Sequence, residues 1–271
     1  MHTDSSLAAV RFPWRVGLLW GITAAALAAL ALHGPIAQPV SYHAFADERT
    51  LLGIPNFWNV VSNLPFVLLG LAGLWRLRRR PPGVLPGLAA CHAAFFAGAV
   101  GIGLGSAWYH LRPDSATLAW DRLPMTVAFM AFFAIVLGEH LGVRLARRAL
   151  PALLLAGLGS VLYWVLSERL GGSDLRPYLL VQFLPVLLTP LILLLFPSRL
   201  TRVGWLWLLL ALYVVAKGVE HFDAALYEHL GGLSGHTLKH LLAAGSLWCM
   251  VAGMSRRRPR AALGEAHLKL T

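Results

Sequence analysis

Eight apolar stretches, each close to 20 residues long, dominate this chain of 271 residues. An α-helix of about 20 residues crosses the roughly 30 Å hydrocarbon core of a bilayer, so each stretch predicts a membrane-spanning helix. Only 13% of the residues are charged, against about 25% in an ordinary soluble domain. We therefore predict an all-α, polytopic membrane helix bundle, and a soluble enzyme is excluded. The expected spans are 14–33, 57–76, 88–109, 122–142, 149–167, 177–196, 203–221 and 236–254.

Basic and acidic connections alternate along the chain. Arginines gather before the first span and after the second, fourth, sixth and eighth, whereas the other connections are rich in Asp and Glu. Because short cytoplasmic loops carry the excess of Lys and Arg, both termini are predicted to be cytoplasmic. The net charge of +11 is then explained without a nucleic-acid partner. The preference for Arg over Lys is typical of a GC-rich bacterial genome, so we expect an inner-membrane protein.

Ionisable residues within the spans concentrate at their outer, periplasmic ends. Ser106 and His110 lie in the last outer turns of the third span, Asp121 introduces the fourth, and His236 and His240 begin the eighth. A spacing of four residues places Ser106 with His110, and His236 with His240, on one helix face. An ionisable group in hydrocarbon is unfavourable unless it is paired, hydrated or bound to a metal. These residues therefore predict a functional site in the outer leaflet.

Three imidazoles with one open position are typical of catalytic zinc, whereas structural zinc has four protein ligands. We predict that His110, His236 and His240 bind zinc, which lowers the pKa of a bound water to about 7. Asp121 could then exchange protons with the water, and Ser106 could donate a hydrogen bond to an oxyanion. Ser106 is equally well explained as a small residue that lets helices pack closely.

Other polar residues of this leaflet have simpler interpretations. Asn59, Ser62 and Asn63 are expected to form hydrogen bonds between helices rather than to bind a metal. Lys217 and Glu220 fit an i, i+3 ion pair at a helix end. The two cysteines lie in apolar runs, so no disulfide is expected.

The order of these motifs resembles the alkaline ceramidase family. The chain reads F-W-N-x-x-S-N at 57–63, S-x-x-x-H at 106–110, then Asp121, and H-x-x-x-H at 236–240. That family falls within a larger group of seven-span membrane hydrolases, which also includes adiponectin-receptor-like and hemolysin III-like proteins. The resemblance covers about residues 50–254. It implies a seven-helix domain at 51–254, an added N-terminal transmembrane helix with an outer loop at 1–50, and a basic cytoplasmic tail at 255–271.

The resemblance implies an intramembrane zinc amidase that hydrolyses the N-acyl bond of ceramide or a related lipid amide within the bilayer. The products would be a fatty acid and a long-chain amine base. It also implies that His110, His236 and His240 are the zinc ligands, that Asp121 orients or deprotonates the attacking water, and that Ser106 steadies the tetrahedral intermediate. Calcium-binding members carry an acid directly before the Phe-Trp-Asn run. Asn56 stands there in this chain, which puts calcium in doubt.

Two functions of other classes compete with this one. A non-enzymatic receptor or lipid-maturation factor stabilised by zinc would have no need of Asp121 or Ser106. A haem-binding electron carrier would use histidines of facing helices as axial ligands, whereas His236 and His240 share one helix. The partners expected are membrane lipids and the lipid substrate, and the sequence predicts no particular oligomeric state.

Overall fold

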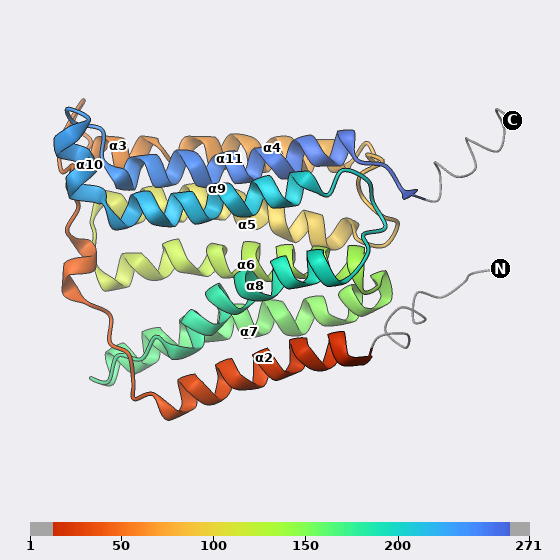
Figure 1. The fold of residues 1–271 in the computed structure, drawn as a ribbon. Helices are drawn as coiled ribbons and strands as arrows, with labels where there is room; N and C mark the ends of the chain where they lie inside the picture. Colours follow the sequence, from red (N-terminus) through yellow and green to blue (C-terminus); the bar gives the residue numbers. More distant parts are fainter. Residues whose placement is uncertain (1–12, 261–271) are drawn as a thin grey trace, which may run out of the picture.

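A computed structural model describes residues 13–260 and forms a bundle of long helices that run side by side (Figure 1). These residues contain no β-strand beyond two isolated bridges, so the predicted all-α fold is confirmed. Residues 255–260 are the only part of the predicted tail within the described range. The elements are α2 (Pro13–Leu32), η1 (Val40–His43), α3 (Phe57–Val61), α4 (Leu64–Leu77), α5 (Ala89–Leu111), α6 (Ser115–His140), α7 (Val143–Arg169), α8 (Arg176–Leu195), α9 (Gly204–His221), α10 (Asp223–His229) and α11 (Gly235–Arg256).

Among the described residues, six segments have the length and apolar composition of a membrane span. A seventh candidate is α9 together with α10, which is bent by 81° at their junction. The remaining long helix, α11, is less apolar because His236, Lys239 and His240 lie in its first turns. It nevertheless packs along α9 and α4 through the bundle (Figure 1). The chain is an integral membrane protein, and a count of eight spans stays a prediction.

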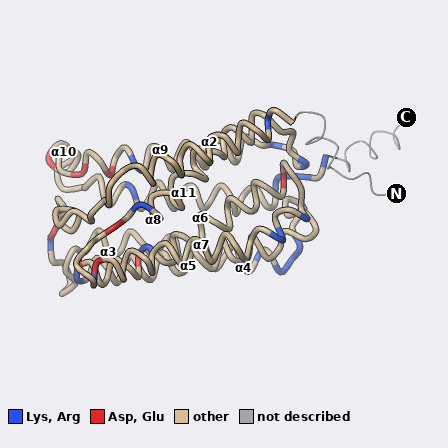
Figure 2. Tube along the Cα trace, turned by 90° about the horizontal axis from the view of Figure 1, so that it is seen from below, with Lys and Arg blue, Asp and Glu red and all other residues tan. Residues whose placement is uncertain are grey.

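Acidic and basic residues gather at opposite ends of the bundle. Figure 2 shows most Asp and Glu at the end that carries α3 and α10, and most Lys and Arg at the end where the described chain begins and finishes. This separation agrees with the alternating charges of the connections. We call the end with α3 and α10 the outer end, following the prediction from the positive-inside rule.

The second predicted span is broken near its outer end. A continuous helix was expected over 57–76, but α3 ends at Val61 and α4 begins at Leu64. Pro65 has no N–H group to donate to the carbonyl of Val61, so one hydrogen bond of a regular helix is missing at this turn. The side-chain amide of Asn63 instead donates to the carbonyl of Asn59 at 2.7 Å. The break therefore turns polar side chains toward the neighbouring helices.

Two other helices begin earlier than predicted. Helix α6 begins at Ser115 rather than near 122, because Asp114 caps it and accepts a hydrogen bond from the N–H of Thr117 at 2.7 Å. Such a cap stabilises the first turn irrespective of hydropathy. Helix α7 begins at Val143 rather than near 149. Polar first turns thus extend both helices beyond their apolar stretches, and Asp121 lies in the second turn of α6 rather than at its start.

The helices close around an internal cavity. Along one side α4 packs on α5, α5 on α6 and α6 on α8, while α11 joins α9 to α4 on the other side. Helices α8 and α9 meet through a hydrogen bond of 3.3 Å from Gln182 Nε2 to Tyr213 Oη. Helix α2 packs against α8 outside this ring. The inner half is filled by apolar side chains that are fully buried, including Phe96, Ile135 and Ile192.

Candidate active site

Three histidines meet at the outer end of the bundle. His110 lies in the last turn of α5, and His236 and His240 lie in the first two turns of α11. Each is at most 5% exposed, and the three side chains offer ring nitrogens within 4.8 Å of one another. The Nε2 atoms of His110 and His236 are 3.2 Å apart, and Nε2 of His240 has no hydrogen-bond partner among residues 13–260. The structure therefore brings the three predicted ligands together.

Polar residues at the break between α3 and α4 hold His240 from behind. Its Nδ1 lies 2.8 Å from the hydroxyl of Ser62 and 3.4 Å from the side-chain amide of Asn63. On the same side, Thr237 of α11 donates to the side-chain oxygen of Asn59 at 3.1 Å. These residues do form hydrogen bonds between helices, as expected. The sequence did not indicate that two of them would orient a histidine of the cluster.

The backbones of the other two histidines are held by residues outside the long helices. The amide of Asn56 donates to the carbonyl of His110 at 2.9 Å. The N–H of His236 donates to Asp223 Oδ1 at 2.6 Å, and Oδ2 of the same carboxylate accepts from the N–H of Ala46 at 2.9 Å. Asp223 thus joins the start of α11 to the loop that precedes α3.

The donor set fits a transition metal. Imidazole nitrogens suit zinc and related ions, whereas calcium and magnesium take oxygen ligands. Within the described residues, the cluster consists of His110, His236 and His240, with no cysteine or carboxylate among them. Because a partner holds Nδ1 of His240, its unpartnered Nε2 is left to bind a metal, as in many metal-ligating histidines. The three buried rings therefore fit the predicted kind of metal centre.

Asp121 and Ser106 face each other across the contact between α5 and α6. Both are buried and line the same cavity as His240. Gly105 allows this contact, because a Cβ at that position would collide with the carbonyl oxygen of Trp120 in α6. Gly105, and not Ser106, is therefore the small residue that permits close packing of α5 on α6. Ser106 is left with a hydroxyl that lines the cavity with Asp121.

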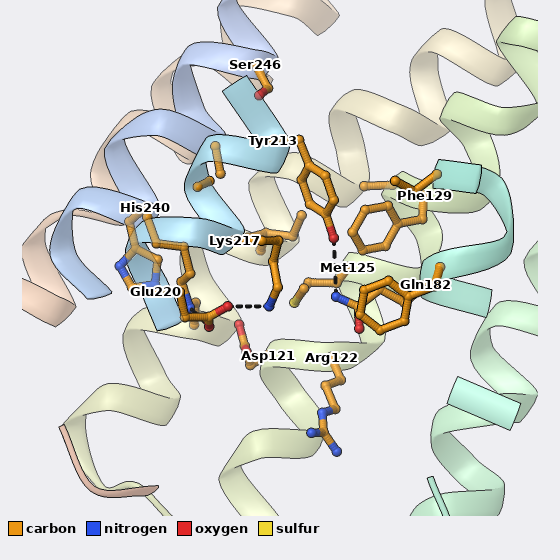
Figure 3. Close-up of a pocket in the computed structure, with 18 of the residues that line it drawn as sticks. Asp121, Arg122, Met125, Phe129, Gln182, Tyr213, Lys217, Glu220, His240 and Ser246 are labelled. Carbon is orange, nitrogen blue, oxygen red and sulfur yellow. Dashed lines mark hydrogen bonds and ion pairs between the residues drawn. The ribbon is translucent and has the colours of Figure 1, made fainter. Parts of the chain in front are cut away.

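A cavity of about 350 Å³ extends from these residues into the bundle (Figure 3). Ligand pockets commonly have volumes of about 300–1,000 Å³. The outer part of its wall is polar and includes Ser106, Asp121 and His240. The deeper wall is apolar and includes Phe66, Phe95, Ala99, Phe132, Leu209 and Leu247. A polar end and an apolar depth suit an amphiphilic ligand.

Two lysines share one glutamate on the cavity wall. Glu220 Oε2 pairs with Lys217 Nζ, and Glu220 Oε1 pairs with Lys239 Nζ at 2.9 Å. Lys239 Nζ also lies 3.0 Å from Nε2 of His236. The sequence predicted the pair within α9, but it gave no signal for Lys239, because a contact between α9 and α11 has no characteristic spacing.

The acid that precedes the second span is paired with an arginine. Both oxygens of Asp47 accept hydrogen bonds from Arg49, at 2.8 and 2.7 Å. Arg49 also donates to the carbonyl of Gly232 at 2.5 Å, just before α11. Burial acts to raise the pKa of the Asp47 carboxyl, but the hydrogen bonds and charge of Arg49 outweigh burial and hold that pKa below its ordinary value. This loop lies against the start of α11, a role that the sequence did not indicate.

A family model described as Ceramidase matches residues 52–193. This segment covers more than half of the chain and contains Ser106, His110 and Asp121. The chain belongs to the ceramidase family. Membership implies a hydrolase that acts on amide bonds, and the apolar helices of the chain are consistent with a lipid substrate in the membrane. No curated protein matches the chain.

The ceramidase match ends within α8, so His236 and His240 lie beyond it. Helix α11 nevertheless packs against α4 of the matched segment, and this contact brings both residues to His110. Helix α2 precedes the match and packs against α8. The histidine cluster of this family member is therefore assembled by tertiary contacts between the matched segment and the helices that follow it.

Proposed function

We propose that this ceramidase-family protein is an intramembrane, zinc-dependent amidase that hydrolyses the N-acyl bond of ceramide or a related lipid amide. One observation carries the proposal: three buried histidines lie together at the outer end of the bundle, and one of them, His240, lines the polar end of an apolar cavity with Asp121 and Ser106. Structural zinc alone would not require a buried acid and a buried hydroxyl at this place.

His110, His236 and His240 would hold the metal through their ring nitrogens. When bound by three imidazoles, zinc supplies a Lewis acid and a water whose pKa is lowered to about 7. Ser62 supports this role, because its contact with Nδ1 of His240 leaves Nε2 of that ring available to bind the metal.

Asp121 and Ser106 supply the proton transfer and the hydrogen bond that amide hydrolysis needs. Asp121 takes a proton from the attacking water and returns it to the leaving nitrogen. Ser106 donates a hydrogen bond to the carbonyl oxygen as that oxygen gains negative charge. A bond forms between the water oxygen and the acyl carbon, and the carbon–nitrogen bond breaks. The products are a fatty acid and an amine.

The cavity determines how such a lipid would lie. The acyl chain occupies the apolar depth between α5, α6 and α9, where it is removed from water. The amide then lies at the outer end, beside Asp121, Ser106 and His240. The scissile bond would then lie in the outer leaflet, at the outer end of the bundle.

The experiment that tests the proposal combines metal analysis with hydrolysis. Wild type and the His236→Ala/His240→Ala variant are purified in detergent, analysed for metals, scanned for haem absorbance and incubated with labelled ceramide. We expect about one zinc per chain and release of fatty acid in the wild type, with both lost in the variant. Zinc without hydrolysis of any lipid amide would favour a receptor, and a Soret band would favour a haem carrier; either result contradicts the proposal.

A further inference from the structure

The cavity wall carries more positive than negative charge. Of the charged side chains that line it, three are positive and two are negative: Arg122, Lys217 and Lys239, against Asp121 and Glu220. Both lysines pair with the single carboxylate of Glu220. One carboxylate neutralises one ammonium, so this group of three, which we call the lysine cluster, keeps one positive charge.

Arg122 and Asp121 carry opposite charges and cancel in this count, so the wall as a whole keeps the single positive charge of the lysine cluster. Arg122 itself lies among aromatic rings. Its guanidinium carbon is 4.4 Å from the ring centre of Trp164 and 4.6 Å from that of Tyr178. One of its nitrogens donates to the side-chain oxygen of Gln38 at 2.5 Å, and Nη1 has no hydrogen-bond partner within the described part of the chain. A metal held by the histidines would add further positive charge. An ionisable group inside a membrane bundle commonly marks the path or site of a substrate.

The lysine cluster lies where the amine half of a lipid amide would be. Once the acyl chain fills the apolar depth and the carbonyl lies at Asp121 and Ser106, the rest of the lipid faces the wall formed by α9 and α11. Figure 3 shows Lys217 and Glu220 on this wall, beside Asp121 and His240. An anionic group attached near the amide nitrogen would therefore meet the surplus ammonium.

We infer that this cavity selects lipid amides with an acidic group close to the amide nitrogen on the amine side, as in N-acyl amino acids. The inference rests on the proposed amidase function and specifies its substrate class. The carboxylate restores the charge balance of the lysine cluster, and charge-assisted hydrogen bonds of this kind are about twice as strong as neutral ones. Hydrolysis adds water across the amide, so the acyl carbon gains the oxygen, the nitrogen gains the proton, and a fatty acid and an amino acid are released.

The test compares two lipids that differ in charge and have nearly the same shape, N-palmitoylglycine and N-palmitoylglycinamide. Wild type should prefer the acid by about 10- to 100-fold in kcat/KM, the contribution expected of a hydrogen bond to a charged group. Lys217→Met leaves one lysine for one glutamate and should bring the ratio close to one. Glu220→Gln leaves two lysines without an acid and should raise the ratio. Lys217→Arg keeps the charge and should keep the preference.

A deeper cavity residue provides the matched control. Ser246 lines the cavity and donates to the carbonyl of Leu209 at 3.1 Å. Ser246→Ala should retain the wild-type ratio between the two lipids. The released fatty acid also carries a carboxylate and could bind the lysine cluster in place of the substrate. Inhibition by free palmitate tests this alternative. If Lys217→Met only relieves inhibition by palmitate and leaves the ratio unchanged, the lysines bind the product and the inference is wrong.

Binding separates this inference from the amidase proposal. In Asp121→Asn, which should not turn the lipid over, the acid should raise the thermal unfolding temperature at lower concentration than the amide does. That difference should vanish when Lys217→Met is added. Equal binding and equal turnover of the two lipids would overturn the inference, while hydrolysis of ceramide would leave the amidase proposal standing. Failure of zinc-loaded wild type to hydrolyse ceramide and both test lipids would overturn the amidase proposal itself.

Discussion

The two ends of the bundle bury polar groups in different ways. At the inner end, Glu139 and Arg257 are at most 3% exposed and form two parallel hydrogen bonds of 2.8 and 2.5 Å. At the outer end, the lysine cluster has two ammoniums for one carboxylate, and Nε2 of His240 lacks a hydrogen-bond partner among the residues that the structure describes. The inner pair balances charge with charge, as a structural contact does. The outer group combines a shared carboxylate with an unpartnered ring nitrogen, an arrangement that is typical of a functional site.

Removing a histidine should have the largest effect, and a histidine at each end allows a matched comparison. His110→Ala should lose the metal and hydrolysis together, because two imidazoles bind zinc much more weakly than three. His140 is also buried, but its Nδ1 contacts the carbonyl of Phe196 at the inner end. His140→Ala should keep the metal content and activity of the wild type. Elemental analysis and hydrolysis of labelled lipid measure both, and equal metal loss in the two variants would contradict the assignment.

Asp121→Asn should leave the metal in place and stop the chemistry. Loss of a general acid and base typically lowers kcat by about 10²- to 10⁴-fold, while the three histidines remain. Single-turnover rates and metal analysis of the same sample give the two quantities. If zinc is lost as fully as in His110→Ala, Asp121 would be a ligand and not the proton carrier.

Glu139→Gln should affect stability and leave the active site intact. It leaves the buried charge of Arg257 unpaired, which typically lowers the free energy of unfolding by about 3–5 kcal/mol. Thermal unfolding in detergent should show the loss, with kcat of the folded protein unchanged below the transition. The double variant Glu139→Gln/Arg257→Met removes the charge and should recover part of the stability. If kcat of Glu139→Gln falls even at temperatures where the protein is fully folded, the inner ion pair affects the active site at the outer end, and the prediction is wrong.

Ser62→Ala should weaken the metal centre without destroying it. The hydroxyl orients His240 through Nδ1 at 2.8 Å, and loss of such a partner typically lowers metal affinity by about 10- to 100-fold. Competition with a zinc chelator measures the change. Ser160, whose hydroxyl bonds to the carbonyl of Gly157 within its own helix, provides a control, since Ser160→Ala should leave zinc affinity unaltered.

The smallest effect concerns acid stability of the outer loop. Arg49 holds the pKa of Asp47 below its ordinary value of 3.8. A group whose pKa is lower in the folded state stabilises the fold fully above its unfolded pKa, and this contribution is lost as pH falls through the folded pKa. Between pH 6 and pH 3, Arg49→Met should therefore lose less thermal stability than wild type. Parallel curves for the two proteins would show that this pair does not contribute.

Much of the fold could be predicted because membrane helices are local in sequence. The apolar stretches located every long helix, and the i, i+4 spacing placed His236 and His240 on one face. Hydropathy failed where polar residues continue or interrupt a helix, as at Ser115 and at Ser62. A cap or a proline decides such boundaries, and neither alters the apolar average.

The sequence by itself determined the helical membrane class, the segregation of charge between the ends, and the depth at which histidines, acid and serine lie. Only the tertiary structure decided which side chains touch: Ser62 behind His240, Lys239 on Glu220, and Arg257 on Glu139. The physical reason is that helix spacing orients residues about one axis, whereas contacts between helices depend on how each helix is rotated and how closely it packs. Gly105 is an example, since its missing side chain lets α6 approach α5 at Trp120, next to Asp121.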